Sequence, residues 1–196
     1  MSHEVISYML QCTDPKKRLQ FHLVLQCAPF LKGLKAACVI NLETALCQEL
    51  AGTFKNTDIS YALLTQGKRS CLVLFYRKIE LAEYLMVKEV RMFLLEYGYS
   101  SFGVEEVLSR LKDNLSVYLG NEAEFPHEMG VILGYPVTDV IGFIENSGQN
   151  YLFSGYWKVY SDLGKAQMTF GMYDYARTCA VNEFVAGKPI ERIVCA

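Results

Sequence analysis

The sequence predicts an α+β fold with a small, mainly antiparallel sheet packed with several helices. Residues 59–65 and 70–77 are rich in β-branched and aromatic side chains, and only four residues separate them, which favours an antiparallel hairpin. Residues 151–160 are rich in aromatic side chains and predict a further strand. Helical segments surround these strands without regular β-α-β alternation, so we expect no large parallel sheet.

The N-terminal part of the chain predicts helices followed by a short strand. Asp14 and Pro15 suit an N-cap and a first helical position, so a helix is expected over residues 16–26. Ala28 and Pro29 interrupt it, and residues 30–37 predict a second, shorter helix. The apolar residues 37–40 predict a short strand.

Three longer segments have helical periodicity. Apolar side chains recur every four residues from Leu42 and predict a helix that closes near Asn56. Residues 79–97 predict one long helix, stopped by Gly98, that covers a face of the hairpin sheet. Residues 104–118 give the most regular amphipathic pattern of the chain.

The last third of the chain predicts two short helices and a long terminal one. The short helices are expected over residues 126–133 and 136–146, each with a proline at its first position and joined by a Gly-Tyr-Pro turn. The terminal helix is expected over residues 163–186 and contains Gly171, a potential break.

Composition limits the functional classes. The chain has 196 residues, of which 52% are hydrophobic and 20% charged, so we expect one folded domain over residues 1–196. The net charge of −2 argues against a nucleic-acid partner, as does the absence of Lys and Arg between residues 121 and 150. We expect no membrane insertion, because no apolar stretch is long enough, and no secretory signal, so a cytoplasmic location follows.

Several sequence blocks resemble a known family. They are 27–35 CAPFLKGLK, 72–77 LVLFYR, 125–130 FPHEMG, 133–136 LGYP, 142–145 GFIE and 155–160 GYWKVY. The chain is similar to domain-of-unknown-function family 3793, uncharacterised proteins of anaerobic Gram-positive bacteria. The likeness implies a family-like core over residues 27–193 and an N-terminal helical extension over residues 1–26, and it implies no activity.

His127 and Glu128 form the most suggestive pair for catalysis. If a helix starts at Pro126, both side chains lie in its first turn, where the positive helix end favours a carboxylate and a neutral imidazole. A neutral imidazole can act as a general base or as a metal ligand. The alternative is structural, with Glu128 capping the turn and His127 bonded to nearby backbone.

Ligand-binding candidates come from basic and aromatic residues. Lys35, Arg77 and Lys158 could hold an anion, although no glycine-rich phosphate loop accompanies them, and ordinary surface pairing is the alternative. Tyr135 lies in the turn between the two short helices, and Trp157 lies in the aromatic strand segment, where one face could line a groove or a dimer contact.

The cysteines show no metal-ligand pattern. Seven are scattered along the chain with no C-x-x-C pair, so we expect reduced thiols, no disulfide requirement for folding and no metal. Cys27 lies just before a predicted helix start, which can lower a thiol pKa, but a buried structural thiol is the alternative.

Two functional hypotheses remain open. The first is a non-enzymatic cytoplasmic binding or accessory protein for a small molecule or a protein partner, with a homo-oligomer also left open. The second is a small enzyme that uses His127 and Glu128, with Arg77 or Lys158 holding an anionic substrate. No sequence motif indicates a cofactor.

Overall fold

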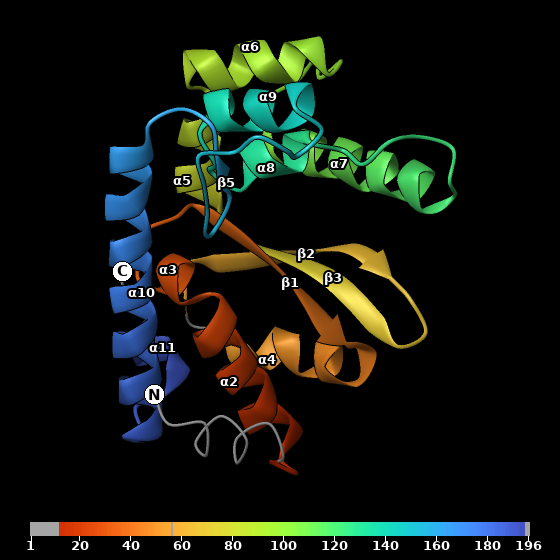
Figure 1. Ribbon diagram of the computed structural model, residues 1–196. Helices are drawn as coiled ribbons and strands as arrows, with labels where there is room; N and C mark the ends of the chain where they lie inside the picture. The colour runs from red at the N-terminus through yellow and green to blue at the C-terminus, as the bar shows by residue number, and fades with distance from the viewer. Residues whose placement is uncertain (1–11, 56, 195–196) are drawn as a thin grey trace. The chain divides into compact units, whose positions relative to one another are not determined.

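The computed structural model describes residues 12–55 and 57–194, and its helices and strands are labelled in Figure 1. Along the chain they are α2 (Pro15–Gln26), α3 (Ala28–Leu31), β1 (Ala37–Glu43), the 3-10 helix η1 (Thr44–Glu49), α4 (Leu50–Thr53), β2 (Ile59–Gln66), β3 (Ser70–Arg77), α5 (Lys78–Leu85), α6 (Lys88–Glu96), α7 (Val104–Leu119), α8 (Glu128–Ile132), α9 (Val137–Glu145), β4 (Phe153–Ser154), β5 (Lys158–Val159), α10 (Leu163–Val185) and α11 (Ile190–Ile193). This content confirms the predicted α+β class. None of the helices within the described residues has the length and apolar character needed to span a membrane.

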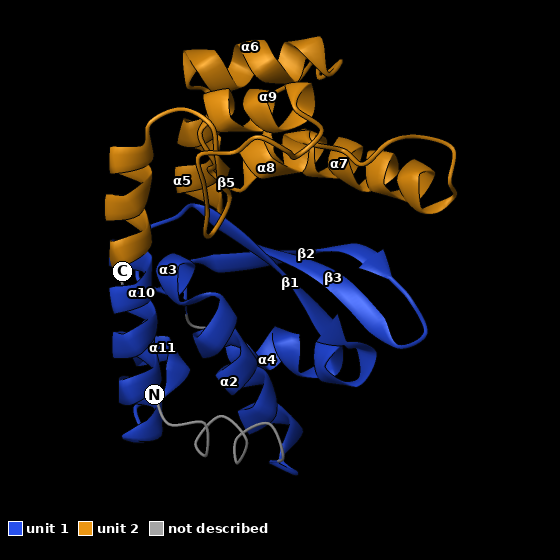
Figure 2. Cartoon of the chain, viewed as in Figure 1, with its two compact units in different colours: residues 1–75, 172–196 blue, residues 76–171 orange. Residues whose placement is uncertain are grey.

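The chain divides into two compact units, which Figure 2 shows in two colours. Unit 1 comprises residues 1–75 and 172–196, and unit 2 comprises residues 76–171. Of the predicted N-terminal extension, residues 1–11 lie outside the described residues, while α2 contributes Leu19, Phe21 and Leu23 to the buried core of unit 1.

The sheet of unit 1 has three antiparallel strands in the order β1-β3-β2. The predicted hairpin is confirmed as β2 and β3, and the amide of Gly67 donates to the carbonyl of Ser70 at 2.8 Å within its turn. The central strand β3 buries Val73, Leu74 and Phe75, as expected for a strand that is apolar on both faces. The strand predicted at residues 37–40 is also present, extended to Glu43.

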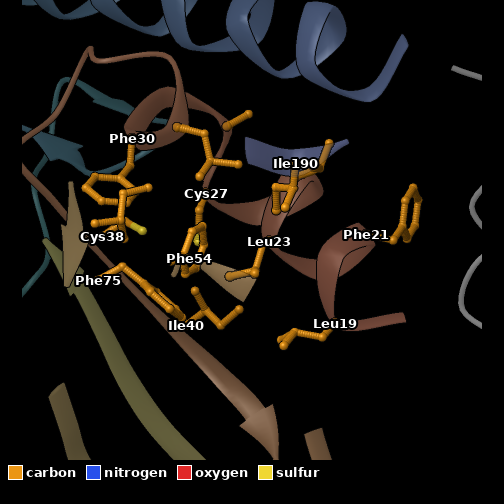
Figure 3. Close-up of a cluster of buried hydrophobic side chains, with 14 of the residues drawn as sticks. Leu19, Phe21, Leu23, Cys27, Phe30, Cys38, Ile40, Phe54, Phe75 and Ile190 are labelled. Carbon is orange, nitrogen blue, oxygen red and sulfur yellow. The ribbon is translucent and has the colours of Figure 1, made fainter. Parts of the chain in front are cut away.

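Helices α2 and α4 lie on one side of this sheet and enclose the main core of unit 1 (Figures 1 and 3). Asp14 caps α2 as predicted, because its Oδ1 accepts from the amides of Lys16 and Lys17. Inside the core, the rings of Phe54 and Phe75 meet edge to face at 5.5 Å. Packing of hydrocarbon and aromatic side chains therefore holds the sheet and its helices together.

Two helices predicted in unit 1 have different bounds. The segment from Leu42 continues β1 first, because the amide of Thr44 donates to the Arg69 carbonyl next to the hairpin turn, and only then forms η1 and α4. The expected end near Asn56 lies outside the described residues. The helix expected over residues 30–37 is α3, which starts earlier because Pro29 suits a first-turn position and ends before Gly33, at φ 71°.

Unit 2 is mainly helical. The predicted helix 79–97 is wrong as a single element: it is α5 and α6, because Val87 has an extended backbone (φ −59°, ψ 132°) and caps α6. Both helices pack with other helices of unit 2, α5 with α7 and α6 with α8 and α9. The amphipathic prediction for residues 104–118 is confirmed by α7, whose apolar stripe is buried.

The segments after α7 also differ in detail from the prediction. Neither proline opens its helix: α8 begins at Glu128, after His127, and Pro136 is the N-cap residue of α9. The predicted strand 151–160 is a hairpin of β4 and β5, with Phe153 opposite Val159, because the chain reverses around Gly155. Helix α10 continues through Gly171 without a break.

Candidate functional site

Asp139 on α9 joins that helix to the segment after β5. Its side chain is only 3% exposed and accepts four hydrogen bonds. Oδ2 accepts from Trp157 Nε1 at 2.7 Å, and Oδ1 accepts from the Tyr160 amide and from the Ser161 amide and hydroxyl. A carboxylate with this many donors is fully satisfied, so Asp139 fixes the hairpin on α9.

Glu128 on α8 is a second buried carboxylate, 2% exposed. Its Oε1 accepts from the Tyr99 hydroxyl at 3.2 Å and from Asn114 Nδ2 at 2.7 Å. Burial, together with the Glu128 charge, raises the pKa of Tyr99 well above its ordinary value. Glu128 therefore links α8 to α7 and to the loop after α6 from inside unit 2, with no large exposed surface to offer a substrate.

His127 lies beside Glu128 in the chain but in a different environment. It is the N-cap residue of α8, it is half-buried, and its side chain makes no cap hydrogen bond. Its ring centroid is 5.6 Å from that of Phe125 and 5.4 Å from that of Phe143. The imidazole therefore packs against aromatic rings, whereas Glu128 is buried among polar side chains. The predicted pair of His127 and Glu128 is adjacent in the sequence, but its two side chains belong to different groups.

Lys158 on β5 extends the same group. Its Nζ lies 4.8 Å from the Tyr151 ring centroid and 5.6 Å from that of Phe143, within cation–π range, and donates to the Gly148 carbonyl at 2.6 Å. We call Phe125, His127, Phe143, Lys158 and Tyr151 the aromatic face, because in this order each member contacts the next. Phe125 and Tyr151 are 40% and 43% exposed, so this face reaches solvent at both ends.

Trp157 and Tyr135, both predicted ligand-binding residues, are brought together. Their rings stack with centroids 5.4 Å apart, and Trp157 meets Phe170 of α10 edge to face at 4.5 Å. A Cβ on Gly155 would come within 2.4 Å of the Phe170 ring, so glycine is required where the hairpin crosses that ring. Trp157 is therefore held on three sides, by Tyr135, Phe170 and Asp139.

The remaining predicted candidates lie elsewhere. Arg77 is buried at the end of β3, and its Nε is 3.8 Å from Glu80 Oε1. Lys35 belongs to unit 1, where burial lowers its pKa and its Nζ lies 5.9 Å from the Tyr173 ring centroid. Cys27 is buried in the core of unit 1, and burial raises its pKa.

Some residues that build this region were not singled out from the sequence. Asp139, Phe125, Phe143 and Tyr151 are examples, and only Asp139 had a usable signal, a single acid within the apolar stretch of residues 137–144. Across residues 12–55 and 57–194, no three His, Cys, Asp or Glu side chains are grouped so as to hold a metal ion.

Comparison with known proteins gives one finding. A family model described as "Protein of unknown function (DUF3793)" matches residues 23–194, which is most of the chain. No curated protein and no solved structure matches the chain significantly.

Proposed function

We propose that this chain, which belongs to the DUF3793 family, is a non-enzymatic binding or accessory protein whose ligand or protein partner docks on the aromatic face of unit 2. Reduced thiols support a cytoplasmic setting, since all six described cysteines are free.

One contrast carries the proposal. The two carboxylates of this region, Glu128 and Asp139, are buried and occupied by internal hydrogen bonds, whereas Phe125 and Tyr151 leave about two-fifths of their surfaces in solvent. General acid-base chemistry needs a titratable group within reach of a substrate. Binding by stacking needs exposed rings on a rigid support. The geometry therefore favours recognition over catalysis.

The chemistry of the face indicates what it would bind. Aromatic rings offer flat apolar contacts, and the Lys158 ammonium retains donors beyond the one given to Gly148. A partner with a planar or apolar group next to a carboxylate or phosphate fits both features. The enzymatic alternative would require Glu128 to give up its bonds with Tyr99 and Asn114 before meeting a substrate.

A binding experiment tests the proposal. Any ligand that co-purifies with the protein is identified by mass spectrometry and then titrated, with emission from Trp157, the only tryptophan, as the signal. We expect Phe125→Ala and Lys158→Gln each to weaken binding at least tenfold. Tyr175→Ala removes a 74% exposed ring of unit 1 and serves as the matched control, which should bind normally.

Two outcomes would contradict the proposal. In one, Phe125→Ala and Lys158→Gln keep the affinity of the parent for the identified ligand. In the other, the ligand is chemically converted by the parent and Glu128→Gln abolishes the conversion while leaving the fold intact. The second outcome would restore the enzymatic alternative.

A further inference from the structure

Strand β2 forms one edge of the sheet of unit 1. The strand order is β1-β3-β2, so β2 pairs with β3 on one side only (Figure 1). Across residues 12–55 and 57–194, no backbone group outside β3 bonds to residues 60–66. An edge of this kind presents a row of backbone donors and acceptors to which another strand can be added.

The hairpin turn shows which backbone groups of β2 lie on the open side. The Gly67 amide donates to the Ser70 carbonyl at 2.8 Å, so the backbone groups of Gly67 point toward β3. Successive residues of an antiparallel strand point their backbone groups to opposite sides. Counting back from Gly67, the odd-numbered residues of β2 therefore bond to β3, whereas the even-numbered residues from Ser60 to Gln66 point their backbone groups away from the sheet.

Strand β2 lacks the features that usually protect the edge of a sheet. Natural edge strands carry charged side chains, prolines or bulges that prevent pairing with another chain. The eight residues of β2, ISYALLTQ, include no charged residue and no proline. Tyr61 is 37% exposed and Ala62 and Thr65 are half-buried, so solvent reaches the strand along its length. The other edge strand, β1, ends at Glu43, whose Oε2 accepts from Arg18 Nη2 on α2 at 2.9 Å.

We propose that β2 is the interface of a homodimer, in which two copies of the chain pair their β2 strands antiparallel across a two-fold axis. The result is one continuous sheet with three strands from each copy. The ends of the strand identify a second copy as the partner, because exposed Asp58 precedes β2 and exposed Lys68 and Arg69 follow it. In an antiparallel pair of identical strands, the start of each strand lies beside the end of the other. Opposite charges therefore meet at both ends of the interface.

The open backbone groups and the two-fold axis also determine the register of this pairing. Hydrogen-bonded pairs across the interface join even-numbered residues, because those residues point their backbone groups outward. The register centred on Leu63 meets this condition and places Asp58 opposite the partner subunit's Lys68. The register centred on Ala62 meets it as well but places Asp58 opposite the partner subunit's Gln66, which gives no charge pair. Charge complementarity therefore favours the register centred on Leu63.

The first test measures the mass of the full chain and of its charge variants. Sedimentation equilibrium is run with reductant from about 1 µM to about 500 µM, because one strand pair gives a small interface. We expect the parent to show a monomer–dimer equilibrium. Asp58→Lys should weaken the dimer about tenfold, since the two-fold axis creates two like-charged pairs. Asp58→Lys combined with Lys68→Asp should restore the affinity to within about threefold of the parent, because opposite charges again face each other.

The second test addresses the backbone of β2. Ala62→Pro removes one outward amide and no bond to β3, so the variant should keep the circular dichroism spectrum of the parent and lose the dimer. Ala62→Val keeps the amide and is the matched control, which should dimerise normally. In the parent, amide hydrogen exchange at residues 60, 62, 64 and 66 should slow as the protein concentration rises, whereas exchange at residues 61, 63 and 65 should not depend on concentration.

The exchange pattern of the parent decides the proposal even if a variant folds poorly. A parent that stays monomeric up to about 500 µM would overturn it. A dimer that forms without slowing exchange at the even-numbered residues of β2 would overturn it as well, because its interface would then lie elsewhere on the chain. The same conclusion would follow if Ala62→Pro and Asp58→Lys both dimerised with the affinity of the parent.

Discussion

Units 1 and 2 bury different kinds of side chain. Among the described residues, the buried polar or charged ones are Thr53 in unit 1 and Arg77, Glu128 and Asp139 in unit 2. The main core of unit 1 consists of aliphatic, aromatic and cysteine side chains. Unit 1 is therefore held by packing, whereas short elements of unit 2 are held by hydrogen bonds to buried carboxylates.

The difference has a structural reason. The central strand β3 satisfies its backbone groups on both sides, with β1 and β2, so the core beneath it needs no polar side chains. In unit 2, the loop after β5 has no such partner strand, and the amides of Tyr160 and Ser161 donate to Asp139 instead. Substitutions should accordingly harm the two units through different mechanisms.

Loss of the Asp139 carboxylate should have the largest effect. Asp139→Ala leaves the Trp157 indole, two amides and a hydroxyl without their acceptor, so we expect a loss of about 4 kcal/mol in the free energy of unfolding. Urea denaturation followed by Trp157 emission measures it. Glu145→Ala, an exposed acid on the same helix, is the control and should change stability by less than about 0.5 kcal/mol. If Asp139→Ala and Glu145→Ala lowered the free energy of unfolding equally, hydrogen bonds to buried carboxylates would not be what holds unit 2 together.

A cavity in the core of unit 1 should come next. Leu23 is fully buried on α2, and Leu23→Ala should lower the free energy of unfolding by about 3 kcal/mol through lost burial and an unfilled cavity. The measurement is urea denaturation followed by circular dichroism. Leu23→Met, which conserves volume, should cost less than about 1.5 kcal/mol. If both variants cost the same, packing does not dominate in unit 1.

Alkaline pH should weaken unit 2 through Tyr99. Its folded-state pKa is raised, so the unfolded chain ionises near pH 10 while the folded protein keeps the proton. This contribution to stability is full below about pH 10 and falls above it by up to about 1.4 kcal/mol per pH unit. In Tyr99→Phe, the free energy of unfolding measured by urea denaturation should decline less steeply between about pH 9 and about pH 11, one pH unit either side of the onset. An unchanged slope would contradict this assignment.

Exposed rings should matter least for stability. Phe125 contacts Tyr118 and His127 but remains 40% exposed, so Phe125→Ala should cost roughly 1 kcal/mol or less. Thermal denaturation of the variant and the parent gives the difference. A loss above about 3 kcal/mol would show that Phe125 is a core residue, and the proposed docking face would lose an anchor.

The accuracy of the sequence predictions depends on the range of the interactions involved. The hairpin of β2 and β3, the Asp14 cap and the stripe of α7 were correct, because turn length, capping and helical periodicity act between near neighbours. The break between α5 and α6 was missed, since residues 79–97 contain no Gly or Pro to signal it.

The predictions of site residues were likewise limited to what near neighbours in the sequence can show. Tyr135 and Trp157 were singled out because they are aromatic, but their stacking could not be foreseen, since it depends on how α9 and the β4–β5 hairpin meet. His127 and Glu128 are adjacent in sequence yet take part in different groups, an aromatic one and a buried polar one. The first turn of α8 leaves His127 half-buried and buries Glu128, and local sequence does not decide which of the two is buried.

The sequence by itself determined the α+β class, the central strand and the resemblance to DUF3793, because composition, period and motif are properties of neighbouring residues. Tertiary structure alone decided that Asp139 would tie α9 to Ser161 and that Lys158 would lie over Phe143. Each of these contacts joins elements far apart in the chain. Their formation requires the fold to bring those elements together first.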